Sequence, residues 1–82
     1  MAWWYLSFCD PEKPKSEQFL GACVINAATM TQAVTESHYR GLNPGGEVAI
    51  VEIPATREEI EQRGLVVNKL LSIDEIKVKR PA

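Results

Sequence analysis

The sequence lacks most of the features that mark an enzyme, a metal site or a membrane protein. It has two cysteines, Cys9 and Cys23, without the C-x-x-C spacing of metal or redox sites, and a single histidine, His38. No apolar run approaches the roughly 18 residues of a membrane span, and no signal-peptide pattern is present. We expect reduced thiols, no metal, no cofactor and no membrane segment. We also expect no enzymatic activity, because no nucleophile and base can be paired.

Length and charge narrow the possibilities further. The chain has 82 residues, which predicts a single domain over 1–82, and its net charge of −2 gives no reason to bind a nucleic-acid polymer. Several of the basic residues are grouped in two short segments of the chain. Lys13 and Lys15 lie in a polar loop, and a short basic run at the C-terminus, which is typical of a solvated tail, holds Lys77, Lys79 and Arg80.

Three apolar stretches predict strands, over 3–9, 19–27 and 47–53. The first two are apolar on both faces, which is typical of strands inside a covered sheet. Between them, residues 10–18 contain two prolines and many charges, so we expect a surface loop. Gly21 within the second stretch predicts a bulge or a close backbone approach.

Capping patterns predict the helices. Thr29 and Gln32 have the spacing of a capping box, and the helix that follows has a moderately apolar stripe formed by Met30, Ala33, Val34, Ser37, His38 and Gly41. Thr56 and Glu59 predict a short charged helix that ends at Gly64, and the segment 72–75 predicts one more helical turn.

These elements predict an α+β fold of the order β-β-α-β. The second and third strands flank a crossover helix and are therefore parallel, and the first strand fits between them antiparallel to both, which gives a three-stranded mixed sheet with the order 2-1-3. One main helix covers one face only. The apolar surface left on the other face predicts a homo-oligomer.

The Asn-Pro-Gly-Gly turn at 43–46 has two interpretations. Consecutive glycine amides can form a nest that binds an anion, or the turn can simply separate a helix from a strand. Arg40, one turn earlier, can reach an anion there or pair with Glu36 four residues before it. The sequence leaves both alternatives open.

Three blocks carry a resemblance to a known family. The blocks W-Y-L-S-F-C-D from Trp4, F-L-G-A from Phe19 and G-L-N-P-G-G-E from Gly41 are similar to those of a family of small proteins encoded by bacteriophages and prophages. The resemblance covers most of the first 50 residues. It implies a phage setting in the cytoplasm of a host cell, and it transfers no catalytic residues.

Within that setting we expect a protein that counters bacterial defence by sequestering a small nucleotide-type immune signal without cleaving it. Phosphates would need amides or cations, and bases would need aromatic faces. The candidate ligand-binding residues are Trp3, Trp4, Ser7, Lys13, Lys15, Arg40, Asn43, Gly45 and Gly46. For the tryptophans, packing is the simpler alternative.

The alternative function is a protein–protein inhibitor of a host defence enzyme. This function requires an exposed apolar or acidic patch and no phosphate site. The sequence offers one acidic candidate, the short helix that carries Glu58, Glu59 and Glu61.

Overall fold

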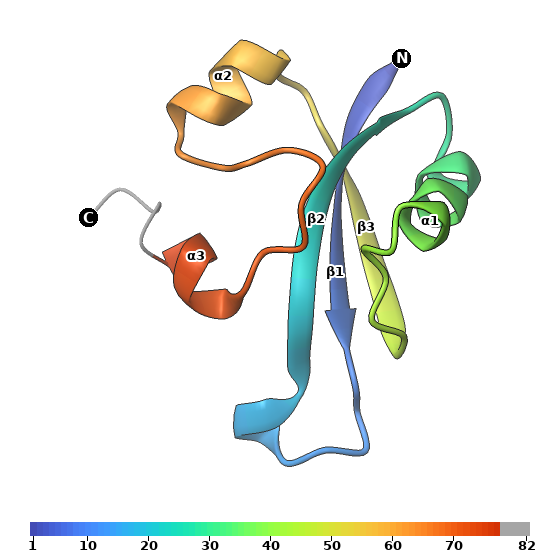
Figure 1. Ribbon diagram of the computed structural model, residues 1–82, viewed down its shortest axis with the longest axis vertical. Coiled ribbons are helices and arrows are strands. Elements are labelled where there is room, and N and C mark those ends of the chain that lie inside the picture. Colours follow the sequence, from blue (N-terminus) through green and yellow to red (C-terminus); the bar gives the residue numbers. More distant parts are fainter. Residues whose placement is uncertain (78–82) are drawn as a thin grey trace.

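The computed structural model describes residues 1–77, and the predicted basic positions Lys79 and Arg80 lie outside the described residues. Helices flank both sides of a central sheet (Figure 1). In chain order the elements are β1 (Ala2–Cys9), the short 3-10 turn η1 (Lys15–Glu17), β2 (Phe19–Ala27), α1 (Met30–Tyr39), β3 (Glu47–Ile53), α2 (Arg57–Gln62) and α3 (Ile73–Lys77).

The sheet has the predicted strand order and strand directions, but both neighbouring pairs are antiparallel, so the sheet is antiparallel and not mixed. Its three strands are ordered β2-β1-β3, and β1 is antiparallel to both neighbours. Leu6 of β1 lies opposite Cys23 of β2 and Ile50 of β3, and this register holds along the sheet except for a shift between Phe8 and Cys9 on the β2 side. The α+β prediction and the strand order 2-1-3 are confirmed.

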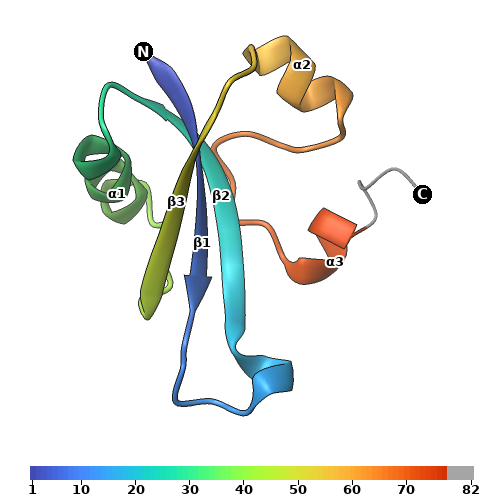
Figure 2. The same cartoon turned by 180° about the vertical axis from the view of Figure 1, so that it is seen from behind.

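The core has one cluster on each face of the sheet, and Figure 2 shows the two layers of helices from behind. On the α1 face, alternate residues of β1 pack with β2 and with Ala33 of α1; the buried members are Trp4, Leu6, Phe8, Cys23, Ile25, Ala27 and Ala33. On the opposite face, Val24 packs with Ile60 of α2 and with Val67. Alternation along the strands therefore supplies both clusters.

The ends of α1 follow from local hydrogen bonds. The Thr29 hydroxyl accepts from the Gln32 amide, as the capping box predicts, but the Gln32 side chain accepts from the amide of Ala28 and not from that of Thr29. At the other end, Gly41 has φ 69° and the Leu42 amide donates to the Ser37 carbonyl. This is a Schellman ending, which stops the helix ahead of the glycine turn.

The predicted inward stripe of α1 is only partly correct. Ala33 and Ser37 are buried and Val34 is half-buried, whereas Met30 and His38 are exposed. Ala33 and Ser37, which lie four residues apart, form the buried side of α1. Met30 and His38 lie beside this buried side. His38 is therefore a surface residue.

The C-terminal third closes against the sheet with two capped helices. Thr56 and Glu59 form the predicted capping box at the start of α2, and Gly64 has φ 84° just after this helix ends. Ser72 and Glu75 exchange backbone and side-chain hydrogen bonds at the start of α3. All three predicted features are confirmed.

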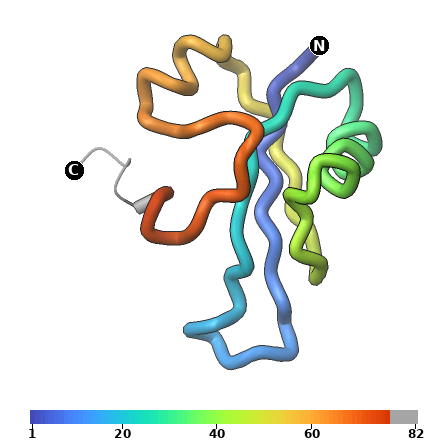
Figure 3. The backbone as a smooth tube through the Cα atoms, viewed as in Figure 1, coloured from blue at the N-terminus to red at the C-terminus, as the bar shows by residue number. Residues whose placement is uncertain are grey.

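Between these helices the chain runs beside β2 (Figure 3). Ala22 and Leu71 exchange both backbone hydrogen bonds, and the Asn68 amide donates to the carbonyl of Val24. A side chain at Gly21 would meet Leu70, and the pairing of β1 with β2 shifts register beside it, so the predicted close approach and irregularity are both present. The segment 68–71 thus covers the middle of the outer edge of β2, at Ala22 and Val24.

Candidate interaction surface

The glycine turn is held by its own side chains. The carboxamide oxygen of Asn43 accepts from the Gly45 amide at 2.8 Å, and its nitrogen donates to the Ser37 hydroxyl at 3.2 Å. That hydroxyl donates to the Val34 carbonyl within α1. Asn43 therefore ties the turn to the helix, and one of the two amides considered for an anion already has a partner.

Gly46 is required for a close backbone approach. It has φ 74°, and a Cβ built on it would lie 2.4 Å from the carbonyl oxygen of Cys9. Since real Cβ atoms do not approach a carbonyl so closely, only glycine lets β3 start beside the end of β1. The turn contributes to packing whether or not it binds a ligand.

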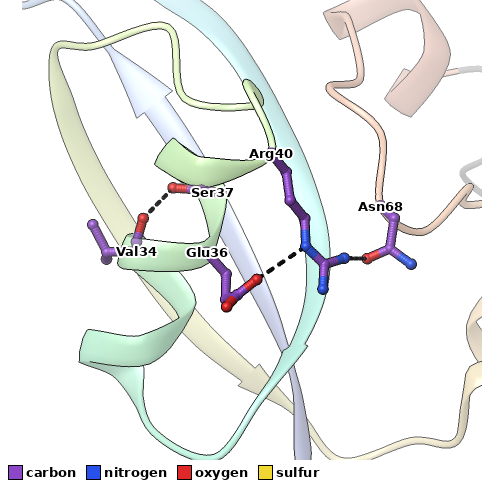
Figure 4. A network of polar contacts seen from close by, with 5 residues as sticks. All are labelled: Val34, Glu36, Ser37, Arg40 and Asn68. Carbon is purple, nitrogen blue, oxygen red and sulfur yellow. Dashed lines mark hydrogen bonds and ion pairs between the residues drawn. The ribbon is translucent and has the colours of Figure 1, made fainter.

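The side chain of Arg40 bonds to Glu36 and Asn68 and so joins two parts of the fold (Figure 4). Its Nε donates to Glu36 at 3.2 Å, and Nη1 donates to the side-chain oxygen of Asn68. The Glu36 pair was one of the two interpretations of this residue. The contact with Asn68 was not predicted, and it links α1 to the segment that covers β2.

The two tryptophans point to opposite faces of the sheet. Trp4 is buried on the α1 side, where its indole N–H donates to the Ala27 carbonyl at 2.9 Å. Trp3 is half-buried and packs on the cluster around Val24. Ser7 is half-buried, lies four residues along β1 from Trp3, and therefore shares its face of the sheet. Packing accounts for both indole rings.

Lys13 and Lys15 are exposed in the loop that joins β1 to β2. The loop is fastened internally, because the Gln18 side chain donates to the Lys13 carbonyl and the Asp10 amide donates to the carbonyl of Gln18. It lies at the end of the sheet where Cys9 opposes Glu47. The lysines and the glycine turn therefore occupy the same end of the molecule.

The candidate residues do not form one cluster. Trp3 pairs with Ile53 at one end of β1, and Cys9 pairs with Glu47 at the other. At about 3.3 Å per residue, six residues of strand separate the two ends by about 20 Å. A base stacked on Trp3 and a phosphate at Gly46 would need to be that far apart.

A feature that sequence reasoning missed is the outer edge of β3. No other segment among residues 1–77 pairs with this edge, although the segment 68–71 covers the equivalent edge of β2. β3 is seven residues long and pairs with β1 without a register shift. Its charged residues are Glu47 and Glu52, near its two ends, and it contains no lysine, arginine or proline. Natural edge strands are usually protected by such residues, by bulges or by a covering segment.

The side chains of β3 are exposed as well. Val51 is 60% exposed and Val48 is 38% exposed, on opposite faces of the sheet. Ala49 is also exposed, and Ile50 is only half-buried. We call the outer edge of β3 together with Val48, Ala49, Ile50 and Val51 the β3 surface. A surface of open backbone groups and apolar side chains is suited to contact another polypeptide.

The α2 helix, the acidic alternative, uses most of its charge locally. Glu59 closes the capping box with Thr56, and Glu61 pairs with Arg57 at 3.0 Å. Glu58 is exposed. These contacts leave α2 a weaker candidate surface than β3.

The described part of the chain offers few groups suited to metal binding or thiol chemistry. Residues 1–77 contain no group of three or more His, Cys, Asp or Glu side chains placed to hold a metal ion. Both cysteines are free, and burial raises the pKa of the Cys23 thiol to about 11. None of the described helices has the length and apolar character needed to cross a membrane.

Comparison with known proteins adds no relative. No family model, curated protein or solved structure matches the chain.

Proposed function

We propose that this protein is an interaction protein that binds another polypeptide by strand addition along the β3 surface. One observation carries the proposal: residues 68–71 pair with the outer edge of β2 at Ala22 and Val24, whereas no segment among residues 1–77 pairs with the seven-residue edge of β3. In strand addition, main-chain hydrogen bonds supply affinity, and alternate side chains supply specificity.

The nucleotide-sequestering hypothesis stays a prediction with less support. Its aromatic residues and its glycine turn lie at opposite ends of β1, and Asn43 occupies the Gly45 amide. The hypothesis of a surface inhibitor of a host defence enzyme belongs to the same class as our proposal, because it also works through protein contact. The phage setting, which stays an expectation from the resemblance, would supply such a partner.

The proposal is tested by selecting peptides of about seven residues, the length that one strand can pair, from a display library. Selection on the wild-type protein is compared with selection on Val51→Lys, because a lysine on an edge strand opposes pairing. Val66→Lys is the matched control, since Val66 is 49% exposed and lies outside β3. We expect extended apolar peptides that bind the wild type and the control but not Val51→Lys. Peptides that bind all three proteins equally would contradict the proposal.

A further inference from the structure

We infer that the partner at the β3 surface is a second copy of the same chain. The two β3 strands pair antiparallel about a two-fold axis at Ile50, which makes one sheet of the order β2-β1-β3-β3-β1-β2. This inference rests on the proposed function and names its partner.

Symmetry restricts the register. In an antiparallel pair, the residue numbers of any two opposite residues add up to the same value. A two-fold axis perpendicular to the sheet passes between one residue and the same residue of the other copy, so this value is twice a residue number. The sum must therefore be even. Ile50 is the middle residue of Glu47–Ile53, so the axis at Ile50 is the symmetric register that pairs all seven residues.

The charges of β3 agree with this register. Its only charged residues, Glu47 and Glu52, have numbers with an odd sum, so no symmetric antiparallel register places one opposite the other. Shifting the pairing by one residue would set Glu47 against Glu52, and like charges directly opposite are destabilising. The same shift would join the α1 face of one copy to the opposite face of the other.

The apolar residues meet one another in the register at Ile50. On the α1 face Ile50 opposes its own copy, and on the other face Ala49 opposes Val51. Val51, the more exposed of the two β3 valines, gains a cross-strand neighbour. Glu52 opposes Val48, so each carboxylate lies beside an apolar side chain and not beside another charge. The backbone of β3 is thus paired, and its apolar side chains gain cross-strand neighbours on both faces of the sheet.

The first experiment is analytical ultracentrifugation over a range of chain concentrations. A single added strand makes an interface at the small end of the known range, so we expect a dimer that dissociates on dilution. Val51→Lys should be monomeric throughout, while Val66→Lys should dimerise as the wild type does. Circular dichroism checks that each variant is folded.

The register is tested by disulfide formation in a Cys9→Ser background. Opposite Cα atoms in an antiparallel pair are about 4.5–5.5 Å apart, which a disulfide can span. Ile50→Cys should crosslink to itself under mild oxidation. Because Ile50 packs against the core, a second test mixes Ala49→Cys with Val51→Cys chains, both at exposed positions. This mixture should form the mixed dimer in preference to either self-crosslink.

The outcomes separate the two proposals. A wild type that stays monomeric at every concentration, while its peptide binding still depends on Val51, would overturn the second-copy inference and leave strand addition standing. A monomer with no such peptide binding would overturn both. Dimers that Val51→Lys does not dissociate, or crosslinks that favour identical residues at 49 or 51, would place the interface or the register elsewhere.

Discussion

Gly46 is the position in the glycine turn where the fold cannot accept a side chain. A Cβ there would lie 2.4 Å from the Cys9 carbonyl oxygen, whereas a Cβ on Gly45 would have nothing within 4 Å. Both residues have positive φ, so each alanine variant suffers backbone strain of about 1–2 kcal/mol. We expect Gly46→Ala to lower the free energy of unfolding by about 2 kcal/mol more than Gly45→Ala does, because β3 must also move away from β1.

Urea denaturation of the two variants measures the difference, provided that their m-values agree. Gly45→Ala is the control for the strain alone. Equal losses of unfolding free energy would mean that β3 can shift without cost, and the glycine at 46 would then need another explanation, such as contact with a ligand.

The hydrogen bond between Asn43 and Gly45 was not predicted, although a local signal for it exists in the sequence. An asparagine followed two residues later by a free backbone amide commonly forms a side-chain turn, and Asn43 does so with Gly45. The contact of Arg40 with Asn68 could not be predicted, because it joins positions 28 apart in the sequence. It also depends on Asn68 adopting φ 58°, which no neighbouring residue dictates.

At the scale of elements, the segment 68–71 makes the two edges of the sheet differ within residues 1–77, because it pairs with β2 and no segment there pairs with β3. Leu71 is 2% exposed and exchanges backbone hydrogen bonds with Ala22. We expect Leu71→Ala to cost about 2–4 kcal/mol of unfolding free energy and to speed hydrogen exchange of the Ala22 amide. The control is Ile73→Ala, which should cost under about 1 kcal/mol because Ile73 is 45% exposed.

Denaturation and amide exchange of both variants check this expectation. If Leu71→Ala leaves exchange at Ala22 unchanged, the segment does not protect the edge of β2. The difference between a protected β2 edge and an unpaired β3 edge, on which the proposed function depends, would then be removed.

The strands and their order were predictable because apolar runs and a single crossover helix leave few arrangements. The identity of the open edge was not, since the apolar pattern of Glu47–Ile53 resembles that of the covered strands. What decides it is the path of the C-terminal segment, which Leu70 and Leu71 anchor on β2. Such long-range packing leaves no periodic signal in the sequence.

At the scale of the whole molecule, the two functional hypotheses differ in their response to small ligands. A ligand that binds only the folded state raises the free energy of unfolding, by about 2.7 kcal/mol at a hundredfold excess over its Kd. The melting temperature rises with it. The groups considered for phosphate and base lie about 20 Å apart along β1. We therefore expect no shift with cyclic dinucleotides, cyclic trinucleotides or ADP-ribose derivatives.

A thermal-shift panel with these compounds measures the response, and it is repeated with a double variant, Lys13→Ala with Lys15→Ala. Both lysines are exposed, so their removal should leave the melting temperature of the free protein nearly unchanged. A shift in the wild type that the double variant loses would place an anion site at the loop end of the sheet. Mass spectrometry of the recovered compound would then separate sequestration from turnover, and strand addition at β3 would become a second activity beside ligand binding.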